Sequence, residues 1–388
     1  MPGLTLAGTR NAELNGIIIH RAGVSGEVRQ TSGEIEIVEN TATVKKSLGA
    51  IRRKAVDLSQ FNPVREAQLS ESELLPLVME PAADQVDLAE WASNHRDYVN
   101  SKLHKHGGVL FRGFGLSTPE DFERVAAAIY KEIYSEYGDL PREGVAGKIY
   151  TSTPYPADKA ILYHNESSHM NAWPTRISFF CVIAAKEGGC SPVVDCRKVY
   201  QQLDPAVRDR FEKLGLMYVR NFSDGLDVSW QRFFQTEERA VAEDACHKQG
   251  FIAEWYGKDS LRVKQKCRGV LRHPVTGEMS FFNQVQLHHV HCLDPETRQS
   301  LLSIFKSEDL PRHVYYGDGS PIEDSVMDHV GELYEKNAVR FQWREGDMVT
   351  LDNMITAHAR DPFVGPRKIV VALGDLVHGA DLDRVSLQ

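Results

Sequence analysis

The chain has 388 residues, of which 42% are hydrophobic and 26% charged, and its formal net charge is −9. This is the composition of a globular protein with a sizeable core, and an acidic chain without a basic stripe argues against a nucleic-acid-binding function. No run approaches the roughly 18 apolar residues of a membrane helix, the N-terminus lacks the order of a secretory signal, and the six cysteines form no CxxC pair. We therefore expect a cytoplasmic protein with reduced thiols and no membrane partner.

The N-terminal residues 1–55 are mixed in composition, and we expect them to form an extension of unknown role. A single domain is expected over residues 56–388, where the apolar pattern becomes denser. A helix is predicted from Leu88 to a glycine terminator at Gly107, because apolar residues recur there at helical spacing. A buried strand over 108–114 follows, and then a helix that begins with Ser117 or Thr118 as its cap.

The rest of the chain alternates short β-rich runs with helical stretches. Strands are predicted at 148–155, 159–166, 176–185, 191–195, 338–353 and 367–377, a hairpin turn at Thr276–Gly277, and helices at 204–215, 236–250, 294–307 and 321–337. The strands show no regular βα alternation. This pattern predicts a mainly β (α+β) fold with inserted helices and a double-stranded β-helix, or jelly-roll, core.

The run ILYHNESSH places His164 and Glu166 two positions apart at the end of an apolar strand. Side chains at i and i+2 of a strand point the same way, so these two can be adjacent ligands of one metal ion. An isolated His-x-Glu also fits a surface ion pair on a barrel rim, which is the commoner arrangement.

A second motif near the C-terminus favours the metal. There, His358 stands at another predicted strand end, and Arg367 opens the last apolar strand. Two histidines and one carboxylate on one side of an iron ion form the facial triad of non-heme Fe(II) oxygenases. A nearby arginine can bind the distal carboxylate of a 2-oxo acid through two N–H groups.

Several segments, in this order along the chain, resemble the TauD/TfdA family of Fe(II)/2-oxoglutarate dioxygenases, and more narrowly its SyrP-like branch of natural-product amino-acid hydroxylases. The resemblance covers about residues 60–380, and the segments that carry it are GVLFRGF, YHNESSH, WPTRISFFCVIAAKEGG, SPVVDCR, YVRNF, SWQRFFQTEERA and DNMITAHARDPFVGPRKI. It implies that residues 56–388 form a TauD/TfdA-like dioxygenase domain.

The resemblance also implies site residues. His164, Glu166 and His358 match the iron ligands, and Arg367 matches the arginine that binds 2-oxoglutarate. Ser191 stands where relatives carry a threonine that also contacts this co-substrate. Glu166 departs from the commoner aspartate of the wider family, although the SyrP-like branch has His-x-Glu, and keeping a carboxylate argues against halogenation.

The implied reaction uses Fe(II), 2-oxoglutarate and O2 to oxidise an unactivated C–H bond of an amino acid, or of an amino-acid-derived substrate that is free or tethered to a carrier protein. Hydroxylation, with succinate and CO2 as co-products, is the expected outcome. Desaturation and oxidative cyclisation remain alternatives, as do a non-catalytic jelly-roll binding protein and a zinc hydrolase. The sequence does not indicate the oligomeric state.

Three further residues are candidates for substrate contact. Arg360 lies two positions past His358 and fits either a substrate carboxylate or an ion pair with Asp361 or Asp352. Asn283, on a predicted strand, fits either a substrate contact or a buried structural amide. His169 is expected in the wall or lid of the pocket rather than on the metal.

Two other polar groups fit structural roles better. The cluster of His288, His289 and His291 has no carboxylate spaced to complete a metal site, so we expect it at the pocket rim or on a surface strand. The pair Asp352–Asn353 is expected in a strand-end turn that directs the approach of the distal histidine.

Overall fold

The computed structural model describes residues 13–14, 17–18, 27–31, 34–38, 62–70, 74–134, 144–151, 155–222 and 228–385. The chain divides into two units, residues 1–61 and 62–388. In the first unit, β1 (Glu13–Leu14) pairs with β2 (Ile17–Ile18), and β3 (Glu27–Thr31) pairs with β4 (Glu34–Val38). The expected domain boundary at 55/56 lies outside the described residues and stays a prediction.

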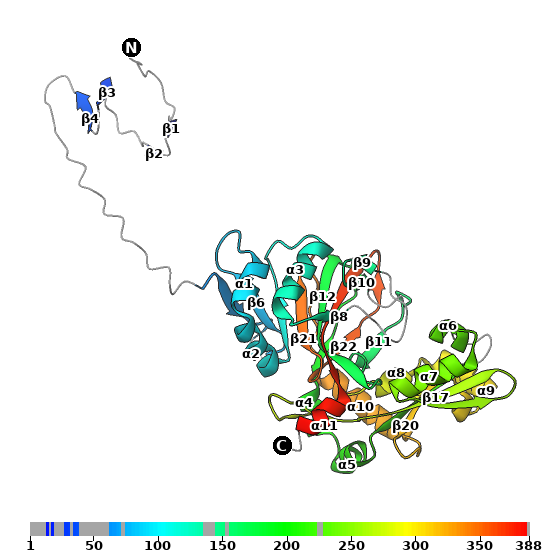
Figure 1. The fold of residues 1–388 in the computed structure, drawn as a ribbon. Helices are drawn as coiled ribbons and strands as arrows, with labels where there is room; N and C mark the ends of the chain where they lie inside the picture. Colours follow the sequence, from blue (N-terminus) through cyan, green and yellow to red (C-terminus); the bar gives the residue numbers. More distant parts are fainter. Residues whose placement is uncertain are drawn as a thin grey trace. The chain divides into compact units, whose positions relative to one another are not determined.

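The second unit is built on a large sheet of nine described strands (Figure 1). In spatial order these are β5 (Val64–Ala67), β6 (Leu77–Pro81), β7 (Gly108–Phe111), β21 (Met348–Asp352), β12 (Ala172–Ile183), β24 (Lys368–His378), β10 (Ile149–Thr151) and β9 (Gly144–Ala146), with β8 (Ile133–Tyr134) paired to β24. All pairs are antiparallel except β6 with β7. The central strand β12 is buried along most of its length, which explains its nearly continuous apolar sequence.

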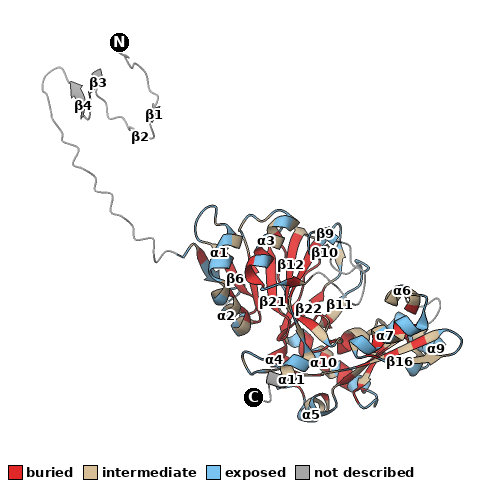
Figure 2. Ribbon diagram, viewed as in Figure 1, coloured by how far each residue is buried: buried red, intermediate tan, exposed pale blue. Residues whose placement is uncertain are grey.

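Three helices cover one face of this sheet, as the views in Figures 1 and 2 show. They are α1 (Leu88–Asn94), α2 (Arg96–His106) and α3 (Pro119–Ile129). Buried side chains of all three helices, among them Trp91, Leu103 and Phe122, pack in one cluster with Phe180 of β12. The single helix predicted from Leu88 is in fact two helices, because the backbone at His95 leaves the helical conformation.

A smaller sheet packs on the other side and carries the site. It consists of β11 (Ile161–His164), β22 (Thr356–Arg360) and β14 (Val193–Asp195), all antiparallel. Val193 of β14 packs with Ile177 and Val371 of the large sheet, so the two sheets share a core. A two-stranded ribbon pairs β13 (Glu187–Gly188) with β23 (Phe363–Val364). In the sequence, β13 comes just before β14, and β23 comes just after β22.

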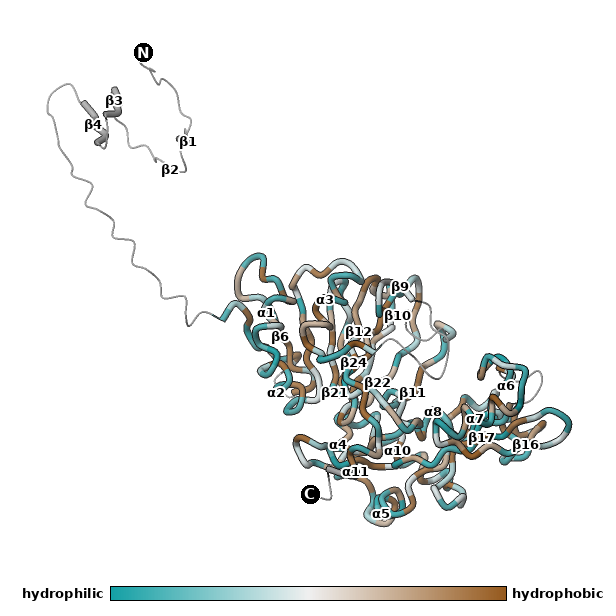
Figure 3. The backbone as a smooth tube through the Cα atoms, in the orientation of Figure 1, coloured by the Kyte–Doolittle hydropathy of each residue, from teal (hydrophilic) through white to brown (hydrophobic). Residues whose placement is uncertain are grey.

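The remaining elements include eight α-helices of the described residues and a separate four-stranded sheet. Its strands are β16 (Ile252–Tyr256), β17 (Ser260–Cys267), β15 (Leu216–Phe222) and β20 (Arg312–Tyr316). The helices are α4 (Cys196–Gln202), α5 (Pro205–Leu214), α6 (Trp230–Phe234), α7 (Arg239–Gln249), α8 (Val285–His288), α9 (Pro295–Ile304), α10 (Asp324–Asn337) and α11 (Gly379–Val385), with 3₁₀ turns at Val290–Cys292 and Ser307–Asp309. Figure 3 shows brown, hydrophobic chain along the inner strands and teal, hydrophilic chain on outer helices and loops.

Most predicted elements are present, and the differences are local. The predicted hairpin is present, as β18 (Leu271–Arg272) and β19 (Met279–Ser280) with Gly277 at positive φ. The strand predicted over 338–353 is wrong in its first half: a turn with Gly346 at φ 88° delays the strand to Met348. The mixed α+β class is confirmed. No helix in the described part of the chain is long and apolar enough to cross a membrane.

Candidate active site

Two histidines come together because their strands are neighbours. In the antiparallel pair β11–β22, His164 lies opposite His358, and His358 also lies opposite Val193 of β14. The centroids of the two imidazole rings are 4.2 Å apart. The motifs that the sequence separates by most of the domain are thus joined by the register of one strand pair.

Glu166 completes the cluster from a position that the strand prediction did not give. β11 ends at His164, and Glu166 follows in a turn in which Ser167 has a φ of 56°. The Oε2 atom of Glu166 lies 3.9 Å from Nε2 of His164 and 3.8 Å from Nε2 of His358. These separations exceed a hydrogen bond and allow one metal ion to be bound between the three atoms.

The electrostatics of the cluster favour a cation. Burial raises the pKa of Glu166 to about 7, since a carboxylate there has lost its hydration. A divalent metal would compensate the charge and keep the group ionised. His164 Nδ1 lies 2.8 Å from the Leu162 carbonyl, which can only accept; this places the proton on Nδ1 and the lone pair on Nε2, toward Glu166.

The triad opens into a cavity of about 620 Å³. Arg367 and Ser191, both predicted to bind a co-substrate, line it and contact each other. Nη2 of Arg367 donates to Oγ of Ser191 at 3.3 Å, and its Nε donates to the Gly189 carbonyl at 3.0 Å. Burial, together with the neighbouring Arg360, lowers the pKa of Arg367 to about 10, so an anion bound here would be favourable.

Arg360 lines the same cavity but makes neither of the ion pairs considered from the sequence. Within the described residues, Asp361 pairs with Arg340 and Asp352 pairs with Arg176. Arg360 instead donates to three backbone carbonyl oxygens, those of residues 155, 156 and 159, at 2.5–3.1 Å. Its guanidinium, which is buried, therefore holds the segment 155–159 at the cavity wall, and among the described residues its Nε has no hydrogen-bond partner.

The strand position expected for Asn283 is wrong, and its side chain does not line the cavity. It lies between β19 and α8, where Nδ2 donates to the Gly269 carbonyl at 3.0 Å and Oδ1 accepts from the Val285 N–H at 3.1 Å. These bonds make it a buried structural amide. The next residue, Gln284, does line the cavity and donates to the Asn165 carbonyl; nothing in the sequence distinguished it.

The other histidines have different places. His169 lines the cavity outside the metal group, as expected, with its ring 5.3 Å from that of His288. The cluster at 288–291 is on a short helix and a 3₁₀ turn rather than on a strand, and of its members His288 lines the cavity, the other place expected for it. Its last member, His291, does meet carboxylates, because α10 brings Asp324 and Asp328 to its ring at 3.3 and 2.6 Å.

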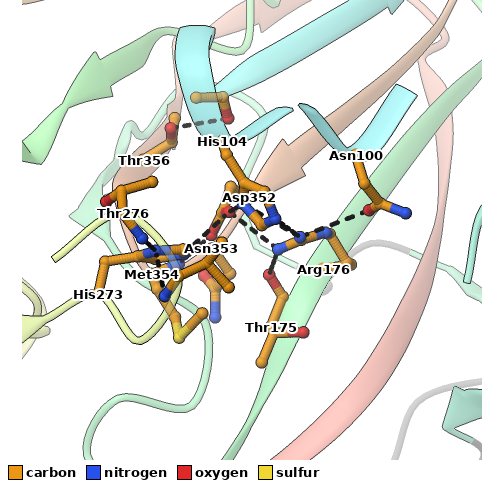
Figure 4. A network of polar contacts seen from close by, with 12 residues as sticks. Asn100, His104, Thr175, Arg176, His273, Thr276, Asp352, Asn353, Met354 and Thr356 are labelled. Atoms are coloured by element: carbon orange, nitrogen blue, oxygen red, sulfur yellow. Dashed lines mark hydrogen bonds and ion pairs between the residues drawn. The ribbon is translucent and has the colours of Figure 1, made fainter. Parts of the chain in front are cut away.

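A second set of two histidines and one carboxylate lies at the turn between β21 and β22 (Figure 4). Oδ2 of Asp352 lies 2.9 Å from Nη1 of Arg176, 3.1 Å from Nδ1 of His104 and 3.3 Å from Nε2 of His273. Burial would raise the pKa of Asp352, but Arg176 and the two imidazoles hold it well below its usual range. We call these four residues the Asp352 hub.

Comparisons with known proteins agree with this geometry. The family profile described as taurine catabolism dioxygenase TauD, TfdA family matches residues 71–373. The chain is 36% identical to the dapdiamide synthesis protein DdaC of Enterobacter agglomerans over 74% of this chain and 88% of that protein. It is 26% identical to a clavaminate synthase-like protein of Arabidopsis thaliana over 80% and 97% of the two chains.

The fold has a counterpart among solved structures. The crystal structure of PvcB from Pseudomonas aeruginosa aligns with 83% of this chain and 94% of its own, with a TM-score of 0.50 and 14% sequence identity. At that identity the likeness concerns the fold alone. The family is shown by the profile, which spans most of the chain, and by the identity to DdaC. The chain belongs to the TauD/TfdA family of Fe(II)/2-oxoglutarate-dependent dioxygenases.

Proposed function

We propose that the protein oxidises an unactivated C–H bond of an amino acid or an amino-acid-derived intermediate in natural-product biosynthesis, most simply by hydroxylation. The family supplies the cofactor, iron, and the co-substrate, 2-oxoglutarate. The relative at 36% identity takes part in dapdiamide synthesis, which supports a natural-product substrate. The His-x-Glu motif agrees with the SyrP-like branch within the family.

The iron ligands in this proposal are His164, Glu166 and His358. The observation that carries it is the convergence of two imidazole nitrogens on one oxygen of a buried carboxylate at a cavity wall. Mixed imidazole and carboxylate donors suit non-heme iron, and a triad on one side leaves positions for other ligands. Iron held by these three residues, with 2-oxoglutarate and O2, would supply the oxidant for the C–H bond.

Arg367 and Ser191 hold the distal carboxylate of 2-oxoglutarate in this proposal. Burial lowers the pKa of Arg367 and so destabilises its charged form, and a carboxylate bound beside it would stabilise that charge. The Ser191 hydroxyl can donate a hydrogen bond to the same anion. Arg360 and His169 are proposed to contact the substrate, because both line the remaining cavity. The buried walls exclude water from the reacting C–H bond.

The decisive experiment is an anaerobic titration of the full chain with Fe(II) and 2-oxoglutarate, followed by visible absorption. We expect a weak metal-to-ligand charge-transfer band that is absent in Glu166→Ala and weaker in Arg367→Ala. Arg340→Ala is the control, since this arginine pairs with Glu335 and Asp361 and does not line the cavity. A folded wild-type protein without the band would refute the proposal and favour a binding protein or a zinc hydrolase.

The substrate is found by adding candidates to the reduced complex and then admitting O2. Free amino acids and carrier-bound aminoacyl thioesters are tested separately, with succinate and product mass as the readouts. A gain of one oxygen atom supports hydroxylation. A loss of two hydrogen atoms with the iron and 2-oxoglutarate requirement intact would support desaturation or cyclisation instead.

A further inference from the structure

We infer that Asn353 is a positioning residue for Glu166, and that the Asp352 hub in turn fixes Asn353. This inference rests on the proposed function, because it explains how the proposed carboxylate ligand of iron is held. It concerns a residue that would not touch the metal or the substrate.

The side chain of Asn353 makes hydrogen bonds to both backbone groups of Glu166. Its Oδ1 accepts from the Glu166 N–H at 2.7 Å, and its Nδ2 donates to the Glu166 carbonyl at 2.9 Å. The second Nδ2 hydrogen is directed to the Pro174 carbonyl at 2.8 Å. Asn353 is fully buried, so no water can replace these bonds.

Glu166 lies two residues beyond the end of its strand, so its backbone is positioned by the turn and not by β11. β11 ends at His164, and the chain turns at Ser167 through a positive φ. The Asn353 amide pairs with both polar backbone groups of Glu166, the N–H and the C=O, as a neighbouring strand would. The neighbouring Asn165 is tied to the same turn, since its Nδ2 donates to the Asn353 carbonyl at 2.8 Å.

The Asp352 hub fixes the backbone next to Asn353, so the Asn353 side chain is held in place to bind Glu166. As Figure 4 shows, Asp352 gathers Arg176 of β12, His104 of α2 and His273 of the β18–β19 hairpin. Its other oxygen, Oδ1, accepts from the Met354 N–H at 3.2 Å. The turn is therefore anchored on both sides of Asn353.

The same turn also leads into β22, which carries His358. One anchored segment thus sets the backbone of Glu166 through the Asn353 side chain and the strand of His358 through the chain itself. The turn therefore fixes the positions of Glu166 and His358 relative to each other. Binding one small ion in a fixed geometry requires this.

The hub itself has metal-binding residue types, but its charge balance makes it structural. The guanidinium of Arg176 already contacts the oxygen that a metal would use, at 2.9 Å, and a dication beside it would be repelled. The inference therefore includes a single metal ion bound by the described residues, at the cluster of Glu166 and not at the hub.

The test measures Mn(II) binding by the full-length protein without O2, using the electron paramagnetic resonance signal of unbound Mn(II). Asn353→Ala removes both side-chain hydrogen bonds to the backbone of Glu166. Asn353→Asp keeps the acceptor but turns an oxygen toward the carbonyls of Glu166 and Pro174. Both variants are expected to bind Mn(II) at least ~10-fold more weakly, the lower end of the effect of groups that orient metal ligands.

A matched control separates positioning from general destabilisation. Asn221 is equally buried, and its Nδ2 also donates to two carbonyls, of Glu308 and Leu310 at 3.0 and 2.7 Å, in the sheet of β15. Asn221→Ala should lower the melting temperature to a similar extent and leave the Mn(II) dissociation constant unchanged. The Fe(II)–2-oxoglutarate absorption band should shift or weaken in the Asn353 variants alone.

The possible results are distinct. Wild-type Mn(II) affinity in either folded Asn353 variant would overturn the inference while leaving the proposed function intact. A wild-type protein that binds no Mn(II) and forms no Fe(II)–2-oxoglutarate band would remove the proposed function and the inference together. Two Mn(II) per chain, one of them lost in His273→Gln, would overturn the structural role given to the hub.

Discussion

Arg367 donates to the hydroxyl of Ser191 across 3.3 Å at the cavity wall. Ser191→Ala removes the acceptor and the oxygen proposed to touch 2-oxoglutarate, and a hydrogen bond to a charged group is worth about 1.5–3 kcal/mol. We expect the KM for 2-oxoglutarate to rise roughly tenfold or more with kcat little changed, measured by succinate formation. Ser191→Thr keeps the hydroxyl and should stay near wild type. An unchanged KM in Ser191→Ala would contradict the role.

The bonds of Arg360 to the backbone predict a local effect on dynamics. Arg360→Gln loses the fork that reaches the carbonyls of residues 155, 156 and 159. Hydrogen–deuterium exchange over 155–160 should become faster, and the affinity for substrate should fall. Arg340→Gln is the control, because Arg340 pairs with the carboxylates of Glu335 and Asp361 and not with this segment. It should leave the exchange of 155–160 unchanged. Equal exchange in both variants would show that Arg360 does not hold the segment.

Breaking the Asp352 hub should be costly for stability. Asp352→Asn leaves the guanidinium of Arg176 buried beside a neutral amide, and removal of one partner of a buried ion pair destabilises a protein by about 3–5 kcal/mol. The free energy of unfolding in urea measures this. Asp361→Asn breaks the more exposed pair with Arg340 and should cost no more than about 1 kcal/mol. Similar losses in both would argue against the hub as an anchor.

A buried histidine predicts how stability depends on pH. Burial, aided by the nearby His289, lowers the pKa of His313 from 6.5 to about 4, although Asp324 acts in the opposite direction. Below pH 6.5 the unfolded chain therefore binds the proton more readily, so stability is full above that pH and is lost as the pH falls toward 4. Between pH 7 and 5 the loss should be roughly 2 kcal/mol.

The measurement is the free energy of unfolding of wild type and His313→Asn at the two pH values. The asparagine keeps an acceptor for the Val290 N–H, which lies 3.4 Å from Nδ1 of His313. This variant should lose less stability at pH 5. His247→Asn, at an exposed position on α7, should follow the wild type. A full acid loss in His313→Asn would place the responsible group elsewhere.

Local signals predicted individual elements well. Ser117 or Thr118 was predicted to cap the helix after β7, and the structure shows Thr118 as the cap, in a capping box with Asp121. The division of α1 from α2 at His95 was not predictable, since neither glycine nor proline marks it. The late start of β21 was missed because Phe341 and Trp343, which suggest a strand, are buried in irregular chain.

The convergence of His164, Glu166 and His358 was predictable because these residues lie in two short motifs of recognisable spacing. The turn of Asp352 and Asn353 before His358 was also predicted, but the contacts that its side chains make were not. Asn353 acts on Glu166 through contacts across the fold, and a buried amide gives no periodic signal. Arg360 was expected to meet a carboxylate, but it binds carbonyl groups, whose positions no residue type reveals. Asn283 was misplaced for the related reason that its apolar neighbours resemble a strand.

The pairing of β11 with β22 has a consequence for biosynthesis. His164 and Glu166 leave the ribosome long before His358, yet the three side chains meet only when β11 and β22 are in register. Under the proposed function, a nascent chain that has not yet exposed β22 has only part of the metal site. Stable metal binding would then report that the chain has been synthesised and folded through β22.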